Sequence, residues 1–540
     1  MERIYYNGII HTMSARNGKE ELELTPEAVL IKEGKILKVG KEEEIFSAAH
    51  KNAQKYDLGG KCLMPSFIDA HSHFLMNSQL SLCADLSDCN SFDEIIATLK
   101  KYIQVNKIKN GQAVLGFGYD HNFLKENAQP DKRVLDKVST DIPIFILHIS
   151  GHLACANSAA MKLAAITADT PNPPGGVIGR LDGSGEPSGY LEEAGMRTVQ
   201  AAIATHIKVN PMKLIKQMKK AYLENGVTTV QDGATAGKDL KLLAGMAKLR
   251  ILNLDVVSYP MIADGGAEII NKYTGLFGSY KNHLKIGGYK IILDGSPQGR
   301  SAWMSEPYLG EPADYYGYPW MKDEDVNRYV EQAVREHRQI LAHCNGDAAS
   351  EQFLNAYENA IAKAGIRDDL RPVMIHCQTV RNDQLDRMAK LNMIASVFVG
   401  HVWYWGDVHL KNFGSARGNH ISPVKDAIKR GIHVNFHQDT PVTKPDMLHS
   451  IWCAVNRRSR AGNVIGENQK IDVYDAMRAV TIEAAYEYFE EDSKGTIEQG
   501  KRADLVILDR SPLLVDPMEI KDIKVLETIK DGKVIFQRGR

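Results

Sequence analysis

The sequence predicts a mixed α/β fold built around a (β/α)8 barrel. Short apolar strands alternate with helical stretches through the middle of the chain, which is typical of a parallel α/β fold. No glycine-rich phosphate fingerprint follows any of these strands, which argues against a doubly wound open sheet. The eight expected strands are 66–74, 228–233, 251–258, 285–294, 339–344, 372–377, 393–398 and 432–439, with helices between several of them at 326–337, 348–364 and 423–430.

Both ends of the chain are expected to form short strands joined by turns. An Asn-Gly step at 7–8 and a Glu-Gly-Lys step at 33–35 suit tight hairpins. Neither end alone has enough strands for a stable core. We therefore expect residues 1–63 and 495–540 to pair into one small β-sandwich domain beside a catalytic domain at 64–494; two unrelated β appendages are the alternative.

The stretch from about residue 75 to 225 is too long to be a connection between two barrel strands. We expect it to be an insertion, and its proline-rich segment at 171–176 predicts an irregular loop. Active sites of barrels form at the carboxyl ends of the strands. An insertion that leaves the first strand is therefore expected to lie over the pocket.

Composition and charge limit the classes of function. The chain is 44% hydrophobic and 25% charged, which is ordinary for a soluble protein with a full core. Its 66 Lys and Arg nearly cancel its 67 Asp and Glu, so there is no electrostatic case for nucleic acid or an anionic membrane. We expect the partner to be a small-molecule substrate, and oligomeric state stays open, with a homodimer as one option.

Cysteine usage and the absence of export signals indicate the compartment. The seven cysteines are scattered and odd in number, which argues against a disulfide framework and for a reducing environment. The first residues lack the basic start and apolar core of a signal peptide, and no apolar run approaches the ~18 residues that span a bilayer. The expected location is the cytoplasm.

The chemistry is expected to centre on the stretch 64–74, which contains His71 and His73. Side chains two residues apart on a strand share one face, so these two imidazoles can bind a single ion. Imidazole is the commonest protein ligand for zinc-like metals. A strand with one buried and one surface histidine is the plain alternative, and ligands farther along the chain decide between them.

Ionisable residues do recur near the carboxyl ends of later expected strands. Lys290, with Asp294 on the same face, lies on the fourth strand, and His343, His376 and Asp439 end the fifth, sixth and eighth. Core packing does not explain such a set, because each unpaired buried polar group would be costly. These side chains are therefore expected to meet at one mouth of the barrel.

These segments together resemble the amidohydrolase superfamily, and within it the amidohydrolase family 3 branch that includes N-substituted formamide deformylase. The resemblance spans nearly the whole chain. It is carried by the Pro-x-Phe-Ile-Asp-Ala-His-x-His entry, Lys-x-x-x-Asp-Gly-Ser, His-Cys-Asn-Gly-Asp-Ala, Gln-Asp-x-Pro and the closing Gly-Thr-Ile-Glu-x-Gly-Lys-x-Ala-Asp-Leu, at 65–73, 290–296, 343–348, 438–441 and 495–505. Segments 151–152, 157–158 and 185–189 of the insertion also match the branch.

The resemblance implies a divalent metal site, most simply for zinc, with one or two ions. His71, His73 and Asp439 would hold one ion, and His343 with His376 would hold or flank a second. Lys290 would bridge them if its amine is carbamylated, since an ammonium has no lone pair to donate. An internal ion pair between Lys290 and Asp294 is the alternative.

The implied reaction is hydrolysis by activated water. A bound metal lowers the pKa of water to about 7 and so supplies hydroxide at neutral pH. Asp439 is the candidate general base, which would then deliver the proton to the leaving nitrogen. A second metal, or else His376 or His343, would polarise the carbonyl oxygen.

Substrate contacts are expected from an aromatic segment and from two loops. His401, Trp403 and Trp405 follow the seventh strand and are expected to wall the pocket, with a loop packing its aromatics onto the insertion as the alternative. Further candidates are Arg300 and Trp303 after the fourth strand and His152 in the insertion; Arg300 would otherwise be solvated.

Other residues beside the candidate ligands are not expected to act in the chemistry. We take His437 as an ordinary surface histidine, and Cys344 and Cys377 as packing residues, because they point away from the ligand face. Gln438 replaces the serine that commonly precedes the last aspartate of the branch, which affects the surroundings of Asp439.

The sequence therefore predicts a metal-dependent amidohydrolase that cleaves a C–N bond of a small N-substituted amide or formamide. Hydrolytic deamination of a heterocycle is the first alternative, but deaminases of this superfamily place Glu three residues after the fifth-strand histidine, where this chain has Gly346. A barrel that serves as a non-catalytic scaffold is the second. Such proteins usually lose metal ligands first, and this chain keeps them.

Overall fold

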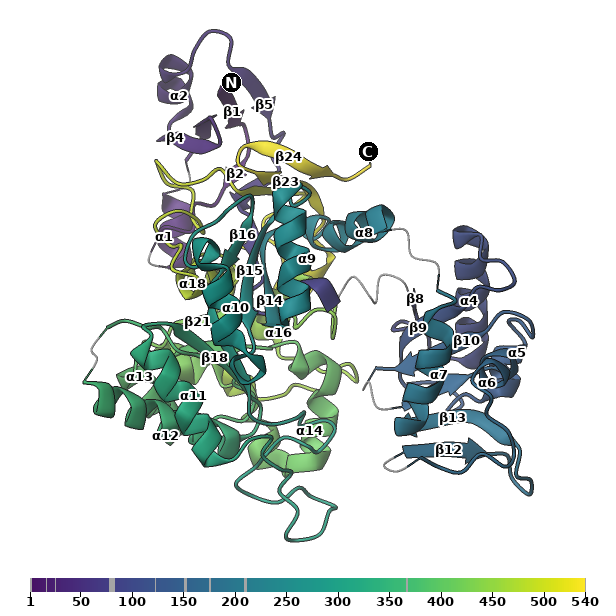
Figure 1. Cartoon of the computed structure of the whole chain (residues 1–540). Coiled ribbons are helices and arrows are strands. Elements are labelled where there is room, and N and C mark those ends of the chain that lie inside the picture. The colour runs from purple at the N-terminus through teal and green to yellow at the C-terminus, as the bar shows by residue number, and fades with distance from the viewer. Residues whose placement is uncertain are drawn as a thin grey trace. The chain divides into compact units, whose positions relative to one another are not determined.

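The computed structural model describes residues 2–15, 17–24, 26–76, 83–121, 123–149, 153–173, 176–207, 211–365 and 368–539. The chain folds as two compact units, Met1–Leu75 with Lys219–Arg540, and Met76–Met218 (Figure 1). The predicted mixed α/β fold is confirmed, because each of the eight expected strand ranges overlaps an observed strand.

Two all-parallel sheets form the centre of the first unit. One has the order β16 (Leu284–Ile286), β15 (Asp255–Pro260), β14 (Val227–Thr235), β7 (Phe67–Ile68). The other has the order β17 (Gly288–Ile292), β18 (Gln339–Cys344), β19 (Val373–His376), β20 (Ile394–Val397), β21 (Val434–Phe436). Parallel strands need long crossovers, and helices supply most of them here.

Backbone contacts connect the two parallel sheets on both sides. β16 and β17 together fill one expected strand, broken at Gly287, where an added Cβ would collide with the Tyr259 ring. On the other side, the Asp439 N–H donates to the His71 carbonyl (3.2 Å) and the His73 N–H donates to the Thr440 carbonyl (2.7 Å). The segment after β21 is thereby joined to the segment after β7.

The first expected strand is much shorter than the sequence predicts. Only Phe67–Ile68 form β7, and 69–72 leave the ladder. The reason is that this segment bonds to two different neighbours: the Asp69 N–H donates to Thr229 and the Ser72 carbonyl accepts from Gly233, while the segment after β21 bonds from the other side. The argument that His71 and His73 share a strand face is therefore wrong.

Helices cover the parallel sheets. In α11, four apolar residues are buried along one face, and Asp323, Glu324 and Asp325 lie in the first turn, where negative charge complements the helix dipole. The helices with bounds in the described part of this unit include α1 (Gly18–Glu23), α2 (Glu42–Ala48), α9 (Gly237–Lys248), α10 (Gly266–Lys272), α11 (Asp323–Arg335), α12 (Asp347–Ala364), α13 (Asn382–Lys390), α14 (His401–Gly418), α15 (Val424–Lys429), α16 (Met447–Asn456), α17 (Val473–Ala479) and α18 (Ile482–Glu487), with α8 (Pro211–Leu223) at the boundary between units. Short 3-10 turns are η1 (Ile262–Asp264), η2 (Thr274–Leu276), η3 (Glu467–Gln469) and η4 (Pro517–Asp522).

The two ends of the chain meet in a second pair of sheets (Figure 1). One has the order β4 (Lys35–Gly40), β3 (Ala28–Lys32), β1 (Glu2–Tyr6), β5 (Gln54–Asp57). The other has the order β2 (Ile9–Ile10), β6 (Cys62–Pro65), β22 (Leu505–Leu508), β23 (Val525–Lys530), β24 (Lys533–Gln537). β6 pairs with β22 in antiparallel register, so both ends contribute strands to one sheet.

A shared apolar cluster holds these two sheets together. Tyr5 and Val29 from one end are buried in the same cluster as Ile497, Leu505 and Ile529 from the other. Burying apolar surface from both ends supplies a core that neither end has alone.

The two expected hairpins have different outcomes. Glu33-Gly34 does connect β3 to its antiparallel neighbour β4, and both residues have positive φ, as a two-residue turn requires. The prediction of a hairpin at Asn7-Gly8 is wrong, because the strands on either side of this step belong to different sheets.

A buried charge network attaches the C-terminal segments to β15. The Asp255 carboxylate accepts from Lys494 Nζ (2.5 Å) and Lys530 Nζ (2.6 Å) on one oxygen and contacts His283 Nδ1 (2.7 Å) with the other. Lys530, on β23, also donates to Asp504 (2.6 Å). Asp255 and both lysines are almost fully buried, so each charge depends on its partners.

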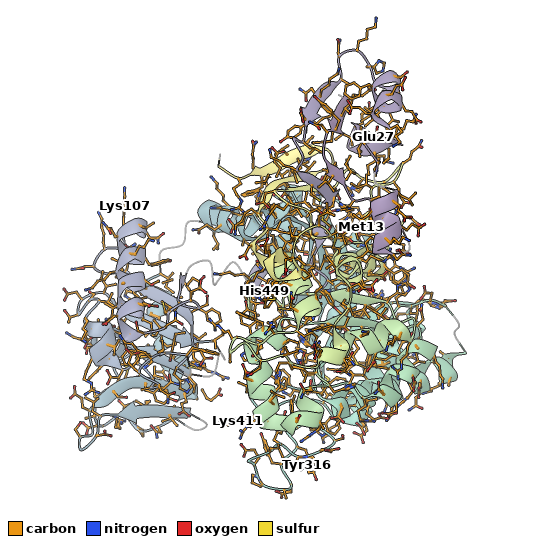
Figure 2. All side chains as sticks on the ribbon, turned by 180° about the vertical axis from the view of Figure 1, so that it is seen from behind. Met13, Glu27, Lys107, Tyr316, Lys411 and His449 are labelled. Carbon is orange, nitrogen blue, oxygen red and sulfur yellow. The ribbon has the colours of Figure 1, made fainter. Side chains whose placement is uncertain are left out.

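The second unit, Met76–Met218, contains its own sheet, of order β12 (Gly176–Arg180), β13 (Pro187–Glu193), β11 (Leu153–Ala156), β10 (Ile144–His148), β9 (Val114–Tyr119), β8 (Cys83–Asp85). Its helices are α4 (Phe92–Asn106), α5 (Lys132–Asp136), α6 (Ser158–Leu163) and α7 (Ala194–Ala204). α4 ends where Lys107, labelled in Figure 2, adopts a left-handed conformation. Two apolar clusters give this unit a core of its own.

All seven cysteines lie among the described residues and all are free. Within the described ranges, no helix combines the length and the apolar character needed to cross a membrane.

Candidate functional site

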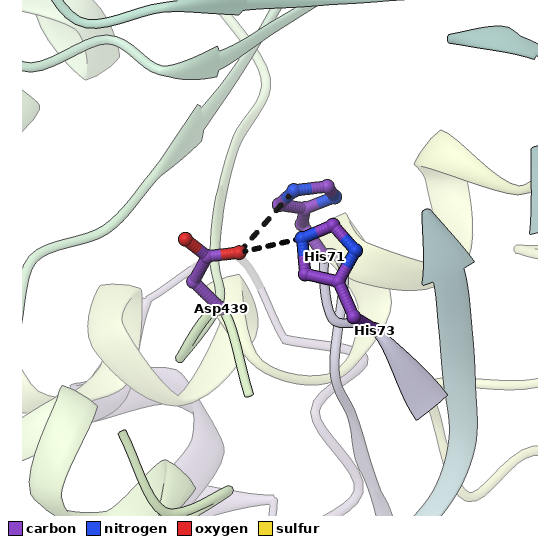
Figure 3. Close-up of side chains that lie close together, drawn as sticks. All are labelled: His71, His73 and Asp439. Atoms are coloured by element: carbon purple, nitrogen blue, oxygen red, sulfur yellow. Dashed lines mark ion pairs between the residues drawn. The ribbon is translucent and has the colours of Figure 1, made fainter. Parts of the chain in front are cut away.

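Two imidazoles and a carboxylate meet where β7 and β21 end. His71 Nε2 and His73 Nε2 lie 3.4 Å and 3.3 Å from the same atom, Asp439 Oδ1 (Figure 3). The His71 side chain is almost fully buried, and those of His73 and Asp439 are largely buried. The three donor atoms lie within 4.8 Å of one another, so these residues can hold one ion.

The other nitrogen of each imidazole is fixed by a hydrogen-bond acceptor. His71 Nδ1 lies 2.5 Å from Gln231 Oε1, and His73 Nδ1 lies 2.9 Å from the Gly233 carbonyl oxygen. Both acceptors come from β14. Because each Nδ1 faces an acceptor, it carries the proton in the neutral ring, and Nε2 then carries the lone pair on the side of Asp439.

Gln231 is itself held in place by three acceptors. Its Nε2 donates to the Ala70 carbonyl (2.7 Å), to Glu487 Oε1 (3.3 Å) and to the Tyr488 hydroxyl (3.3 Å). The amide is thus oriented with its oxygen toward His71. The sequence interpretation missed Gln231, although a glutamine followed by an aspartate near the end of an apolar strand was a usable signal.

Replacing Gln231 with methionine should weaken the binding of a divalent cation at this site about 10- to 100-fold, because His71 loses the acceptor that fixes its tautomer and ring orientation. Competition with a chromophoric chelator measures this. The matched control is Gln469→Met, since Gln469 is also buried but bonds to Asp426 on another part of the fold. Equal affinities in the wild type and in Gln231→Met would contradict the assigned role.

The electrostatics of His71, His73 and Asp439, called the trio below, favour an ionised Asp439 carboxylate beside a neutral His71 imidazole. Burial raises the pKa of Asp439, but the neighbouring imidazoles, His73 above all, outweigh it and hold that pKa well below its usual range. Burial and the charge of Lys290 lower the pKa of His71 well below its usual value. Burial lowers the pKa of His73 too, but Asp439 raises it overall.

Lys290 lies next to the trio, on β17. Its Nζ is 3.5 Å from His71 Nε2, and the side chain is buried. Burial lowers the pKa of Lys290 to about 8, while the charge of Asp439 acts in the opposite direction. A neutral amine is therefore accessible at mildly alkaline pH, and only the neutral amine has a lone pair that can react with carbon dioxide.

The alternative partner of Lys290, Asp294, is engaged elsewhere. Its carboxylate accepts from the backbone N–H groups of Trp303 (3.0 Å), Asn345 (3.0 Å) and Gly346 (2.7 Å). Among the described residues, no ion pair joins Lys290 to Asp294, so that alternative is wrong. Burial raises the pKa of Asp294 to about 7, although the three backbone donors oppose this.

His343 and His376 form a pair at the ends of β18 and β19. His376 Nε2 lies 3.0 Å from His343 Nδ1, and the ring centroids are 4.3 Å apart. The His376 ring lies 5.7 Å from the His71 ring, which places the pair beside the trio. His376 Nδ1 is buried and has no partner among the described residues.

The backbone at two of these positions is left-handed. His376 has φ +75° and Asp439 has φ +52°, and neither is glycine. Such conformations cost about 1–3 kcal/mol each and cluster at functional sites. The surrounding packing therefore holds these two side chains in place at a local cost.

His437 is not a surface residue, so the prediction that it is an ordinary surface histidine is wrong. It is fully buried, with its ring 5.2 Å from that of His71 and 5.1 Å from that of His376. It follows β21 directly, and its burial against the rings of His71 and His376 comes from tertiary contacts that the sequence alone does not reveal. Burial lowers the pKa of His437 to about 3, so it is neutral.

The expected aromatic segment after β20 is the start of helix α14 and not a loop. His401 and Trp405 pack on Phe398, with ring centroids 4.6 Å and 6.1 Å away, and Phe398 in turn lies 5.4 Å from His437. These two candidates therefore connect to the site through Phe398.

Trp403 points to a different neighbour. Its ring lies 5.2 Å from that of Trp452 and 5.9 Å from that of His449, both on α16; His449 is labelled in Figure 2. Lys521 lies over the Trp403 ring at 5.5 Å. These ring neighbours are not residues of the candidate metal site, so a substrate contact at Trp403 stays a prediction.

The remaining substrate candidates are placed as follows. Arg300 forms an ion pair with Glu311 and donates to Asn412 Oδ1 (3.0 Å), so its guanidinium is not simply solvated. The backbone of Trp303 contacts Asp294 and packs against Gly346. His152 lies outside the described residues.

The residues next to the ligands have ordinary packing partners. Gln438 Nε2 donates to the Asp446 carbonyl (2.7 Å) and Ser450 Oγ (2.8 Å), so it anchors the segment before α16. Cys344 and Cys377 are buried, and burial raises the pKa of both thiols. Neither thiol is poised as a nucleophile.

The donor set fits a divalent cation of the zinc type. Asp439 Oδ1 is buried and has no hydrogen-bond partner among the described residues, although two imidazole nitrogens lie just over 3 Å away. Ligands of a tetrahedral zinc ion with bonds of about 2.0–2.1 Å lie about 3.3–3.4 Å apart. The separations of 3.4 Å and 3.3 Å match that spacing.

Comparisons with known proteins find similarity along nearly the whole chain. Residues 54–536 match the profile of the Amidohydrolase family. The putative amidohydrolase YtcJ of Bacillus subtilis is 26% identical over 558 aligned residues, with both chains fully covered. The N-substituted formamide deformylase of Arthrobacter pascens is 28% identical over 557, with 98% of both chains covered. A crystal structure of an uncharacterized metal-dependent hydrolase from Pyrococcus horikoshii has a TM-score of 0.73 at 24% identity and covers 96% of this chain and 99% of that chain. This chain belongs to the amidohydrolase family.

Proposed function

We propose that this protein is a metal-dependent amidohydrolase that cleaves the C–N bond of a small N-substituted amide or formamide. The observation that carries the proposal is the meeting of His71 Nε2 and His73 Nε2 at the unpartnered Asp439 Oδ1. Similarity to an N-substituted formamide deformylase over nearly the full length supports the substrate class.

The cation is proposed to be zinc, held by His71, His73 and Asp439. His376, with its unpartnered Nδ1, and Lys290 are the candidate ligands for a second ion. Mixed nitrogen and oxygen donors suit zinc better than magnesium or calcium, which prefer oxygen. When bound, the cation would lower the pKa of a water molecule to about 7 and polarise a carbonyl oxygen.

The protein's own groups would manage the protons. Asp439 stays ionised because of its lowered pKa, so Oδ2 can accept a proton from the attacking water while Oδ1 faces the two imidazoles. Asp439 would then give that proton to the leaving nitrogen, since an amine leaves poorly without it. If only one ion is bound, the neutral His343–His376 pair can instead donate one N–H to the carbonyl oxygen.

The role of Lys290 as a carbamylated bridging ligand can be tested by chemical rescue. Lys290→Ala should lower kcat/KM by about 10²-fold or more, because a ligand is worth several kcal/mol. Acetate or propionate should restore activity, since a carboxylate replaces the carbamate. Restoration by ethylammonium and not by carboxylates would show that Lys290 acts as a cation instead.

Deamination is disfavoured by local geometry as well as by sequence. Any side chain at Gly346 would collide with the Trp303 carbonyl oxygen, because the two backbones are in contact there. A glutamate that protonates a ring nitrogen therefore has no room at this position. A non-catalytic scaffold is disfavoured because Asp439, His71 and His73 are already arranged at ligand spacing.

We also propose a domain division that positions this site. The two parallel sheets would form one closed (β/α)8 barrel, supported by their connections at Gly287 and between 71–73 and 439–440. The paired chain ends, 1–63 and 495–540, would be a β-sandwich domain, and Met76–Met218 the insertion.

The substrate class is tested with zinc-loaded protein and a panel of N-substituted formamides, N-acyl amino acids, cyclic ureides, aminopyrimidines and guanine. We expect turnover of a formamide or amide, with stoichiometric release of amine and carboxylate. Preferred turnover of an aminopyrimidine or guanine, with release of ammonia, would establish deamination instead.

A further inference from the structure

A second group of metal-type donors lies in the unit Met76–Met218, in residues that take no part in the site described above. Asp120 and His121 follow β9 directly, and His148 is the last residue of β10. The three donor atoms lie within 4.8 Å of one another. β9 and β10 are parallel neighbours, so their carboxyl ends bring the three side chains to one edge of the sheet.

Two of the three separations between donor atoms are close to those of ligands around one zinc-type cation. His148 Nε2 lies 3.2 Å from His121 Nδ1 and 3.4 Å from Asp120 Oδ1, and His121 Nδ1 lies 3.9 Å from Asp120 Oδ1. A tetrahedral zinc ion with bonds of about 2.0–2.1 Å spaces its ligands about 3.3–3.4 Å apart. The His71–Asp439 and His73–Asp439 separations in the first site are 3.4 Å and 3.3 Å.

The backbone around this group is fixed. The Ile149 N–H donates to the Tyr119 carbonyl (3.0 Å), and the Phe123 N–H donates to the Asp120 carbonyl (3.0 Å). The Tyr119 ring packs edge-on against His148 at 5.2 Å, and its hydroxyl donates to Gln129 (3.0 Å). The donors therefore lie at the adjoining ends of two paired strands.

Burial and charge suit a divalent cation at this position. The His148 side chain is 6% exposed, that of Asp120 14% and that of His121 29%, so the group is shielded on one side and reachable on the other. Two imidazole nitrogens and one carboxylate oxygen are donor types that zinc-like ions accept, and the carboxylate offsets part of a double positive charge. Three ligands leave coordination positions open.

We propose that Asp120, His121 and His148 form a second divalent-cation site, selective for zinc-type ions, with at least one position open for water or an anionic ligand. The site does not depend on the proposed function, because it shares no residue with His71, His73 or Asp439. Magnesium and calcium are poor candidates because they favour all-oxygen ligand sets.

The first test is the zinc content of the full chain, measured by mass spectrometry of the metal after loading and removal of loose ions. Relative to wild type, His121→Gln and Asp120→Asn should each lose about one equivalent of zinc per chain. This holds whatever number of zinc ions the first site, at His71, His73 and Asp439, binds. The control His206→Gln, a partly exposed histidine of the same unit, should keep the wild-type content. Combining His71→Ala with His121→Gln should remove both contributions additively.

A second readout separates a ligand from a residue that only supports the fold. His121→Cys keeps a donor, so with cobalt it should bind the ion and show a thiolate-to-cobalt charge-transfer band that the wild type lacks. Wild-type zinc content in both His121→Gln and Asp120→Asn would overturn the proposal, as would the absence of that band in His121→Cys. Loss of activity alone decides nothing here, so the result is independent of whether the first site is correctly assigned.

Discussion

Asp439→Asn is expected to lower kcat/KM by about 10²–10⁴-fold, the range that a positioned general acid–base group contributes. The variant keeps the size of the side chain but removes the negative charge that two imidazoles share at Oδ1. It also removes the oxygen that accepts and returns the proton, so both the cation and the proton transfer are affected. Steady-state kinetics on the substrate identified by the panel measures the effect.

The control for this prediction is Asp383→Asn, because Asp383 is exposed and pairs with Arg381 on the surface. Its kcat/KM should stay within about twofold of wild type. Zinc content should fall in Asp439→Asn and not in the control. Wild-type turnover by Asp439→Asn, with zinc retained, would count decisively against Asp439 as ligand and base.

Asp255→Asn is expected to destabilise the protein by about 3–5 kcal/mol, because it leaves two buried lysines without their shared carboxylate. Lys494 and Lys530 are only 2% and 3% exposed, so water cannot replace the lost partner. The measurement is the shift in the urea midpoint relative to wild type. The control Asp386→Asn breaks an exposed pair with Arg430 and should cost less than about 1 kcal/mol.

The stability difference between wild type and Asp255→Asn should depend on pH with a definite sign. Burial raises the pKa of Asp255, but the charges of Lys494 and Lys530 outweigh it and hold the pKa well below its usual range. The unfolded chain therefore binds this proton first as the pH falls. The stabilisation is complete above about pH 4 and is lost at lower pH. The difference in unfolding free energy between wild type and Asp255→Asn should therefore become smaller in acid. A difference that grows there would contradict an ionised Asp255 in the folded protein.

The alternation of strands and helices could be predicted from sequence because it depends on local periodicity. The expected strands at 339–344 and 393–398 contain β18 and β20, and the expected helix 348–364 differs from α12 by one residue. The pairing of β6 with β22 was predictable only by elimination, since neither end had enough strands alone.

Tertiary contacts decided what the sequence could not. The short length of β7 follows from bonds that 69–73 make to segments more than 150 residues away, which no local pattern encodes. The burial of His437 depends on its ring contacts with His71 and His376, which belong to distant parts of the sequence. The histidines, Lys290 and Asp439 were predictable because they recur at strand ends, whereas Gln231 acts through His71 and carries no chemistry of its own.

The most direct test of the central claim is anomalous X-ray diffraction at the zinc absorption edge from crystals of the zinc-loaded protein. The account predicts an anomalous peak bonded to His71 Nε2, His73 Nε2 and Asp439 Oδ1. Zinc peaks elsewhere in the molecule, with none between these three atoms, would contradict it.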